Sequence, residues 1–149
     1  MIRLWLWFLI LGLTTACTVA APSTSTSPST ATPIADSTRT DTQGAVEFVV
    51  TPLNLNANAA TLEFDVAMNT HSVDVNWDLA AQSTLTTDAG LEVSGSQWTV
   101  GSGHHYESTL VFPAQTSEGQ PLLAGAKTLT LVIRDTDVPE RTFVWQLKP

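Results

Sequence analysis

The sequence has little cysteine, little positive charge and no long apolar run after its first residues. Cys17 is the only cysteine among 149 residues, which excludes an intramolecular disulfide. Lysine and arginine number 6 against 14 aspartates and glutamates, giving a formal net charge of −8. We therefore do not expect nucleic acid as a partner, because a polyanion binds to basic surfaces. Beyond the N-terminus, no segment is long and apolar enough for a membrane-spanning helix.

Sequence motifs of the common enzyme classes are also missing. No serine lies in a GxSxG motif, and neither HExxH nor HxH occurs. Gly101-Ser102-Gly103 lacks the third glycine and the following helix of a phosphate-binding loop. His71, Ser72 and Asp74 lie too close together in the chain to form a three-part catalytic relay. We therefore expect a protein that is not an enzyme.

Residues 1–16 have the features of a secretory signal peptide. Arg3 precedes an apolar run from Leu4 to Leu13, which is short for a transmembrane helix. The segment Leu13-Thr14-Thr15-Ala16-Cys17 resembles the lipobox of bacterial lipoproteins. This resemblance implies cleavage before Cys17 and attachment of membrane lipid to its thiol. The protein would then be extracytoplasmic, anchored to the outer face of the cytoplasmic membrane or to an outer membrane. The alternative is an ordinary secreted protein whose cysteine is incidental.

Residues 17–43 are predicted to form a disordered tether after the lipidated Cys17. Of the 26 residues from Thr18 to Gln43, 13 are Ser or Thr and 3 are Pro. Such a composition buries too little apolar surface to offset the entropy of ordering. As a flexible coil, the tether would span roughly 30 Å. We expect it to hold a folded domain away from the membrane.

Residues 44–149 are predicted to form one β-domain, organised around the stretch from Thr61 to Leu79. Leu62, Phe64, Val66 and Met68 alternate with polar or small residues, as they do in a strand with one buried face. The alternation then shifts by one position to Val73, Val75, Trp77 and Leu79. This shift predicts two strands separated by a turn at residues 69–72.

Short strands of the same kind recur through the rest of this domain. Apolar alternation or turn signals mark further strands at residues 46–50, 85–87, 91–93, 97–100, 106–112, 128–134 and 143–147. Seven to nine short strands of this kind favour an all-β, Ig-like antiparallel sandwich. An open β-barrel is the alternative fold. Short helical turns are predicted at residues 80–82 and 122–125.

The three histidines are the residues most suited to bind a ligand. His71 lies in the run Thr70-His71-Ser72-Val73-Asp74, and His104 and His105 follow Gly101-Ser102-Gly103. Imidazole and carboxylate groups ligate Zn²⁺ and Cu²⁺, so His71, His104, His105, Asp74 and Asp78 are candidate metal ligands. Successive residues of a strand point to opposite faces, so only one of His104 and His105 can face His71 if both lie in the strand. Both histidines can do so if they lie in the loop. The alternative is that these histidines only form hydrogen bonds within their turns.

One aromatic residue is a further candidate. Trp98 follows the polar run from Ser94 to Gln97, and its indole could stack on a ligand. Met68 is a soft ligand type for Cu(I), but its position in the apolar alternation places it in the core.

Two motifs resemble sequences in Ig-like domains of bacterial surface lipoproteins: the THSVD run at residues 70–74 and the GHH run at residues 103–105. This resemblance implies a β-sandwich at the cell surface. Three hypotheses follow from the sequence: a lipid-anchored, non-enzymatic binding module with an unknown protein partner; a metal-binding lipoprotein that holds Zn or Cu through its histidines; and a hydrolase.

Overall fold

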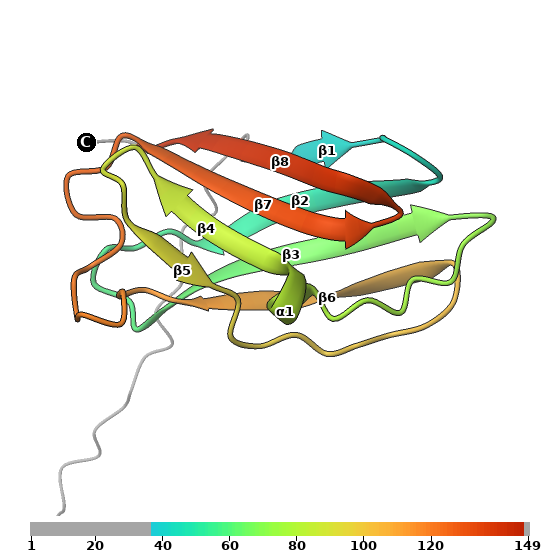
Figure 1. Cartoon of the computed structure of the whole chain (residues 1–149), viewed down its shortest axis with the longest axis horizontal. Helices are drawn as coiled ribbons and strands as arrows, with labels where there is room; N and C mark the ends of the chain where they lie inside the picture. Colours follow the sequence, from blue (N-terminus) through green and yellow to red (C-terminus); the bar gives the residue numbers. More distant parts are fainter. Residues whose placement is uncertain (1–36, 148–149) are drawn as a thin grey trace, which may run out of the picture.

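The computed structural model describes residues 37–147, which fold into two antiparallel sheets of four strands that pack face to face (Figure 1). Sheet A has the strand order β1-β2-β3-β6, formed by β1 (Arg39–Asp41), β2 (Val46–Asn54), β3 (Thr61–Thr70) and β6 (His105–Pro113). Sheet B has the order β5-β4-β7-β8, formed by β4 (Ser83–Thr87), β5 (Glu92–Ser94), β7 (Thr128–Thr136) and β8 (Val138–Gln146). A single helical turn, α1 (Leu79–Gln82), precedes β4.

The strand order confirms the Ig-like sandwich expected from the sequence. Strands β2, β3 and β6 are ordered as A, B and E of an Ig-like domain, and β5, β4, β7 and β8 as C′, C, F and G. Strand β1 is an additional edge strand beside β2. The strands form two separate four-stranded sheets and do not close into one. The structure is therefore a sandwich and not the open β-barrel that is the alternative fold from the sequence.

The core lies between the sheets and follows the alternation in the sequence. On β3, Leu62, Phe64, Val66 and Met68 are fully buried, while the intervening residues face outward. The Phe64 ring packs against Trp145 of sheet B, with 5.2 Å between ring centroids, and edge-on against Phe112 at 5.8 Å. The Phe64–Trp145 contact joins the two sheets, and both aromatic contacts add to the stabilisation from apolar burial.

The strand predicted at residues 73–79 is not present. Val75 and Leu79 are buried, but this stretch is an irregular connection that leads from sheet A to sheet B. Alternating apolar residues report alternating burial, whereas a strand also requires a neighbouring strand for its backbone hydrogen bonds. The predicted helical turn at 80–82 is confirmed as α1. Asp78 caps it by accepting hydrogen bonds from the backbone N–H groups of Ala80 and Ala81, at 3.1 and 3.4 Å.

The folded domain begins earlier than the sequence predicts, because residues 37–43, which have the composition of a tether, belong to the sandwich through strand β1. Strand β1 pairs with β2, with Arg39 opposite Val50. The Trp145 indole donates a hydrogen bond to the Ser37 carbonyl oxygen, and Arg39 Nε donates to the Val144 carbonyl oxygen at 2.9 Å. The pairing with β2 and the hydrogen bond to Ser37 use main-chain groups of this segment, so a Ser/Thr-rich composition does not reveal them. The signal peptide, Cys17 and the rest of the tether lie outside the described residues.

A buried cation connects the two sheets at this edge. Arg141 of β8 is fully buried, and its guanidinium group forms an ion pair with Asp41 of β1. It also donates hydrogen bonds to the carbonyl oxygens of Gln43 at 2.8 Å and Thr136 at 3.3 Å, and it lies 4.4 Å from the centre of the Phe48 ring. Burial raises the pKa of Asp41, but hydrogen bonds from Gln43 and the charge of Arg141 outweigh it, leaving that pKa below its ordinary value.

Within residues 37–147, no helix has both the length and the apolar character that a membrane span requires.

Replacing Phe64 by alanine tests the aromatic core. We expect Phe64→Ala to lower the free energy of unfolding by about 3 to 5 kcal/mol, because it leaves a cavity between the sheets. The control Leu53→Ala alters a side chain that is 42% exposed and should change stability by about 0.5 kcal/mol or less. Urea denaturation followed by tryptophan fluorescence measures both. A loss below about 1 kcal/mol for Phe64→Ala would contradict the assigned core.

Replacing Asp41 by asparagine tests the buried ion pair. Asp41→Asn leaves the Arg141 charge without its partner and should cost about 3 kcal/mol or more at pH 7. Adding Arg141→Met should recover part of this loss, because an apolar side chain of similar size needs no counter-charge. Equal stability of the single and double variants would contradict this account.

The same pair predicts how stability depends on pH. Since the pKa of Asp41 is lowered in the folded protein, its ionisation stabilises the fold above about pH 4, and this contribution is lost as the pH falls through the folded-state pKa. The melting temperature of the wild type should therefore fall more steeply below pH 4 than that of Asp41→Asn. Parallel curves for the two proteins between pH 2 and 7 would show that Asp41 has no such role.

Candidate functional site

The candidate site lies at one end of the sandwich, where several loops meet (Figure 1). These are the β1–β2 loop at residues 42–45, the start of the β3–β4 connection, the loop before β6, and the β7–β8 turn at Asp137. Hydrogen bonds join them: the Ala45 N–H donates to Asp137 Oδ2 at 2.6 Å, and the Thr70 N–H donates to the His104 carbonyl oxygen at 2.8 Å. This end corresponds to the one that carries the B–C and F–G loops of Ig-like domains, which bind ligands in antibodies.

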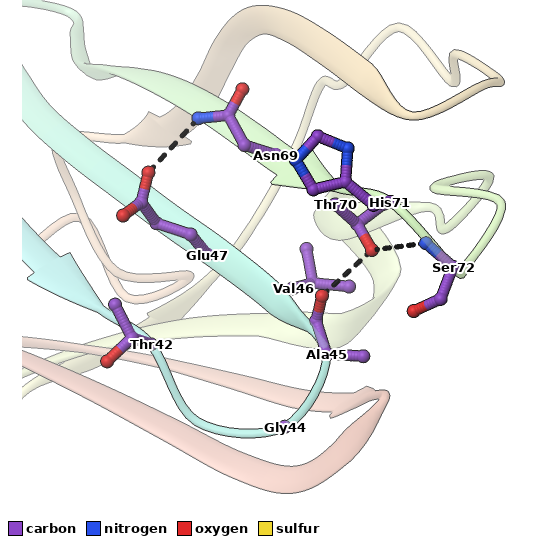
Figure 2. Close-up of a pocket in the computed structure, with 9 residues that line it drawn as sticks. All are labelled: Thr42, Gly44, Ala45, Val46, Glu47, Asn69, Thr70, His71 and Ser72. Atoms are coloured by element: carbon purple, nitrogen blue, oxygen red, sulfur yellow. Dashed lines mark hydrogen bonds between the residues drawn. The ribbon is translucent and has the colours of Figure 1, made fainter.

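A shallow pocket opens at this end (Figure 2). Its volume is about 400 Å³, and it is lined by the β1–β2 loop, the first residues of β2 and the chain from Asn69 to Ser72. The buried Thr70 hydroxyl supports the wall, donating to the Ala45 carbonyl oxygen at 2.8 Å and accepting from the Ser72 N–H at 3.2 Å. The polar groups of Glu47, Asn69 and His71 are thereby held around an opening to solvent.

Two of the three histidines are brought together beside this pocket. Strand β6 begins at His105, which lies opposite Asn69 in the β3–β6 register. The rings of His71 and His105 are 5.9 Å apart between centroids, with their planes at 82° to each other. His104 is exposed and precedes the strand by one residue, and its backbone pairs with Thr70. His105 is therefore the member of the pair that meets His71.

His105 is held by a chain of side-chain hydrogen bonds that the sequence did not reveal. Asn69 Nδ2 donates to Glu47 Oε1 at 3.3 Å, and Asn69 Oδ1 lies 3.0 Å from His105 Nδ1. The Glu47 carboxylate accepts hydrogen bonds, so it orients the Asn69 amide with its oxygen toward the histidine. His105 Nδ1 must then carry the hydrogen, and Nε2 of the neutral ring keeps its lone pair. Asn69 and His71 are two residues apart, so a strand points both to the same face. This spacing is the signal in the sequence that could have identified Asn69 as part of the site.

The remaining predicted metal ligands have other roles. Asp74 Oδ1 accepts a hydrogen bond from the Gly103 N–H at 2.6 Å, which ties the β3–β4 connection to the loop before β6. Asp78 caps α1. Among residues 37–147, no group of three or more His, Cys, Asp and Glu side chains is placed to hold a metal ion. The five predicted residues His71, His104, His105, Asp74 and Asp78 therefore do not assemble as one group, and both carboxylates of this set accept hydrogen bonds from backbone N–H groups.

Trp98 is not a surface residue, so the prediction that it stacks on a ligand is wrong. It is only 9% exposed, and its indole N–H donates to the Trp77 carbonyl oxygen at 3.1 Å. Its ring packs edge-on against Tyr106, with 5.8 Å between centroids. The polar run before it begins at the last residue of β5 and ends at Gln97, which forms a bridge with Val111 of β6. Glycine is required at position 101 because a side chain there would overlap the Tyr106 ring.

Carboxylates lie on the outer face of sheet A, with Glu47 and Glu107 nearest to His105 and Asp65 further along β3. Glu47, Asp65 and Glu107 point outward from β2, β3 and β6. Partial burial and the neighbouring charge of Glu107 raise the pKa of Asp65. Such a field favours the approach of a cation over that of an anion.

A second hollow, of about 560 Å³, lies between β5 and the end of β6. It is lined mainly by Ser94, Ser96, Gln115, Thr116 and Ser117, together with Glu92. None of the candidate ligand-binding or metal-binding residues predicted from the sequence lines this hollow.

No protein-family model matches the chain, and neither does any curated protein or solved structure with which it was compared.

Proposed function

We propose that the protein is a lipid-anchored, extracytoplasmic binding module that acts by binding and not by catalysis. It would be held at a membrane through Cys17 and would present the loop end around His71 and His105 to its ligand. The anchor is supported by the lipobox-like run ending at Cys17, and the binding end by the pocket and the exposed polar groups beside it.

The observation that carries this proposal is the placement of the pocket relative to the start of the domain. Strand β8 begins at the loop end with Val138, and Trp145 lies seven residues further along it. Ser37 is bound to Trp145, so the domain begins away from the loop end. A chain anchored through its N-terminal segment would therefore be attached at the end away from the pocket, which leaves the pocket accessible to a ligand.

The groups at the loop end suit recognition of a polar or cationic ligand. Glu47, Asn69 and His105 form a preorganised hydrogen-bonded chain, which lowers the entropic cost of binding. His71 adds a second exposed imidazole. Carboxylates on the adjacent face of sheet A supply negative charge.

The anchor is tested by replacing the predicted lipidation site. Cys17→Ser should move the protein from the membrane fraction to the soluble fraction, or leave it unprocessed, because the thiol that carries the lipid is gone. Ser23→Ala serves as the matched control and should stay in the membrane fraction. Immunoblots of both fractions give the result. Recovery of Cys17→Ser in membranes at the normal mature size would rule out the anchor.

The binding end is tested by site-specific photo-cross-linking in cells. A photo-reactive residue at exposed Ser102, in the loop before β6, should give a discrete adduct of higher mass. The same residue at exposed Ala89, in the β4–β5 turn at the other end of the sandwich, should give none. Equal adducts at both positions, or none at either, would contradict a binding site at the loop end.

A further inference from the structure

The separation of the His71 and His105 rings falls between the values expected for tetrahedral and for in-line ligands on one metal ion. A zinc–nitrogen bond is about 2.0 to 2.1 Å long, which places the ion about 3.2 Å from the centroid of each ligating imidazole ring. Two such rings are then about 4.5 Å apart for ligands at a right angle, about 5.2 Å for tetrahedral ligands and about 6.4 Å for ligands in line. The observed separation of 5.9 Å lies inside this range.

His105 is also oriented as a metal-ligating histidine is. In metalloproteins, the ring nitrogen that does not bind the metal usually donates its hydrogen to an oxygen, which fixes the tautomer and the direction of the ring. Asn69 Oδ1 provides this oxygen for His105 Nδ1, and Glu47 in turn fixes Asn69 (Figure 2 shows the Glu47–Asn69 bond). The lone pair of Nε2 is therefore available to an external ion.

We propose that His71 and His105 form a two-histidine site for a divalent transition-metal ion, Zn²⁺ or Cu²⁺. Both cations bind well to imidazole nitrogen, and the nearby carboxylates of Glu47 and Glu107 favour a positive ion. This proposal deepens the proposed function and rests on it for its biological purpose, because the ion would be what the loop end offers to a ligand.

The ion would keep coordination positions open on the side of the solvent. Within residues 37–147, no third His, Cys, Asp or Glu joins this pair to form a larger group, whereas Zn²⁺ takes four ligands. Water would fill the remaining positions until a partner supplies a carboxylate or an imidazole. The expected site is thus an open one that binds a ligand through the metal, unlike a closed structural zinc site.

The test is a metal titration of the whole chain after signal removal, carrying Cys17→Ser and purified without a polyhistidine tag. The serine removes a thiol that would compete for metal. Calorimetry with Zn²⁺ should show one ion per chain, and electron paramagnetic resonance with Cu²⁺ should show coupling to two imidazole nitrogens. His71→Ala and His105→Ala should each weaken binding at least about tenfold, and Asn69→Ala, which removes only the orienting oxygen, about 10- to 100-fold.

His104→Ala is the matched control, since this residue is adjacent to His105 but is not part of the pair. It should leave the metal affinity within about twofold of the wild type. Circular dichroism of every variant, each altered at an exposed or half-buried position, confirms that it is folded. The proposal would be overturned if His104→Ala weakened binding as much as His105→Ala, or if the wild type showed fewer than two imidazole nitrogens on Cu²⁺.

The result of the metal titration can be distinguished from the result of the cross-linking test of the proposed function. Absence of metal binding with a persistent Ser102 adduct would remove the metal and keep the binding module. Metal binding by the His71–His105 pair without any Ser102 adduct would support the metal site and contradict the proposed binding function.

Discussion

The fold depends on the way in which one buried charge is balanced. Arg141 lies between the sheets, where an unpaired guanidinium would be strongly unfavourable. Its charge is balanced by Asp41 from β1, by the carbonyl oxygens of Gln43 and Thr136, and by the face of the Phe48 ring. These partners come from both sheets and from the loop that lines the pocket. This side chain therefore ties β8 of one sheet to β1 and β2 of the other and helps to position the β1–β2 loop at the candidate site.

The candidate site arises from the pairing of β3 with β6. Asn69 and His71 follow the outward-facing parity of β3, and the register places His105 opposite Asn69. A shift of one residue in that register would turn His105 to the other face of the sheet and bring His104 outward in its place. The Glu47 carboxylate is added from β2, on the other side of β3, and completes the hydrogen-bonded chain. Residues far apart in sequence thus meet through two adjacent strand pairings.

Three differences from the sequence-based expectations share one physical origin. The stretch from Val73 to Leu79 has the alternation of a strand but leaves sheet A without joining a ladder. Trp98 follows polar residues, yet its ring is buried and packs against Tyr106. Residues 37–43 have the composition of a tether, but their main chain pairs with β2 and binds Trp145 and Arg141. In each case local composition reports polarity, whereas the conformation depends on a partner elsewhere in the chain.

The sequence by itself determined which apolar residues of the main strands face the core, and therefore the all-β class, because a strand's period of two can be read from neighbouring residues. It also identified His71 and the His104–His105 pair as the notable polar groups. Only the tertiary structure decided that His105 meets His71, that Asn69 and Glu47 orient it, and that Asp74 and Asp78 are engaged by backbone N–H groups. These arrangements depend on strand register and on contacts between distant segments, which follow from the packing of the whole domain and not from any local pattern.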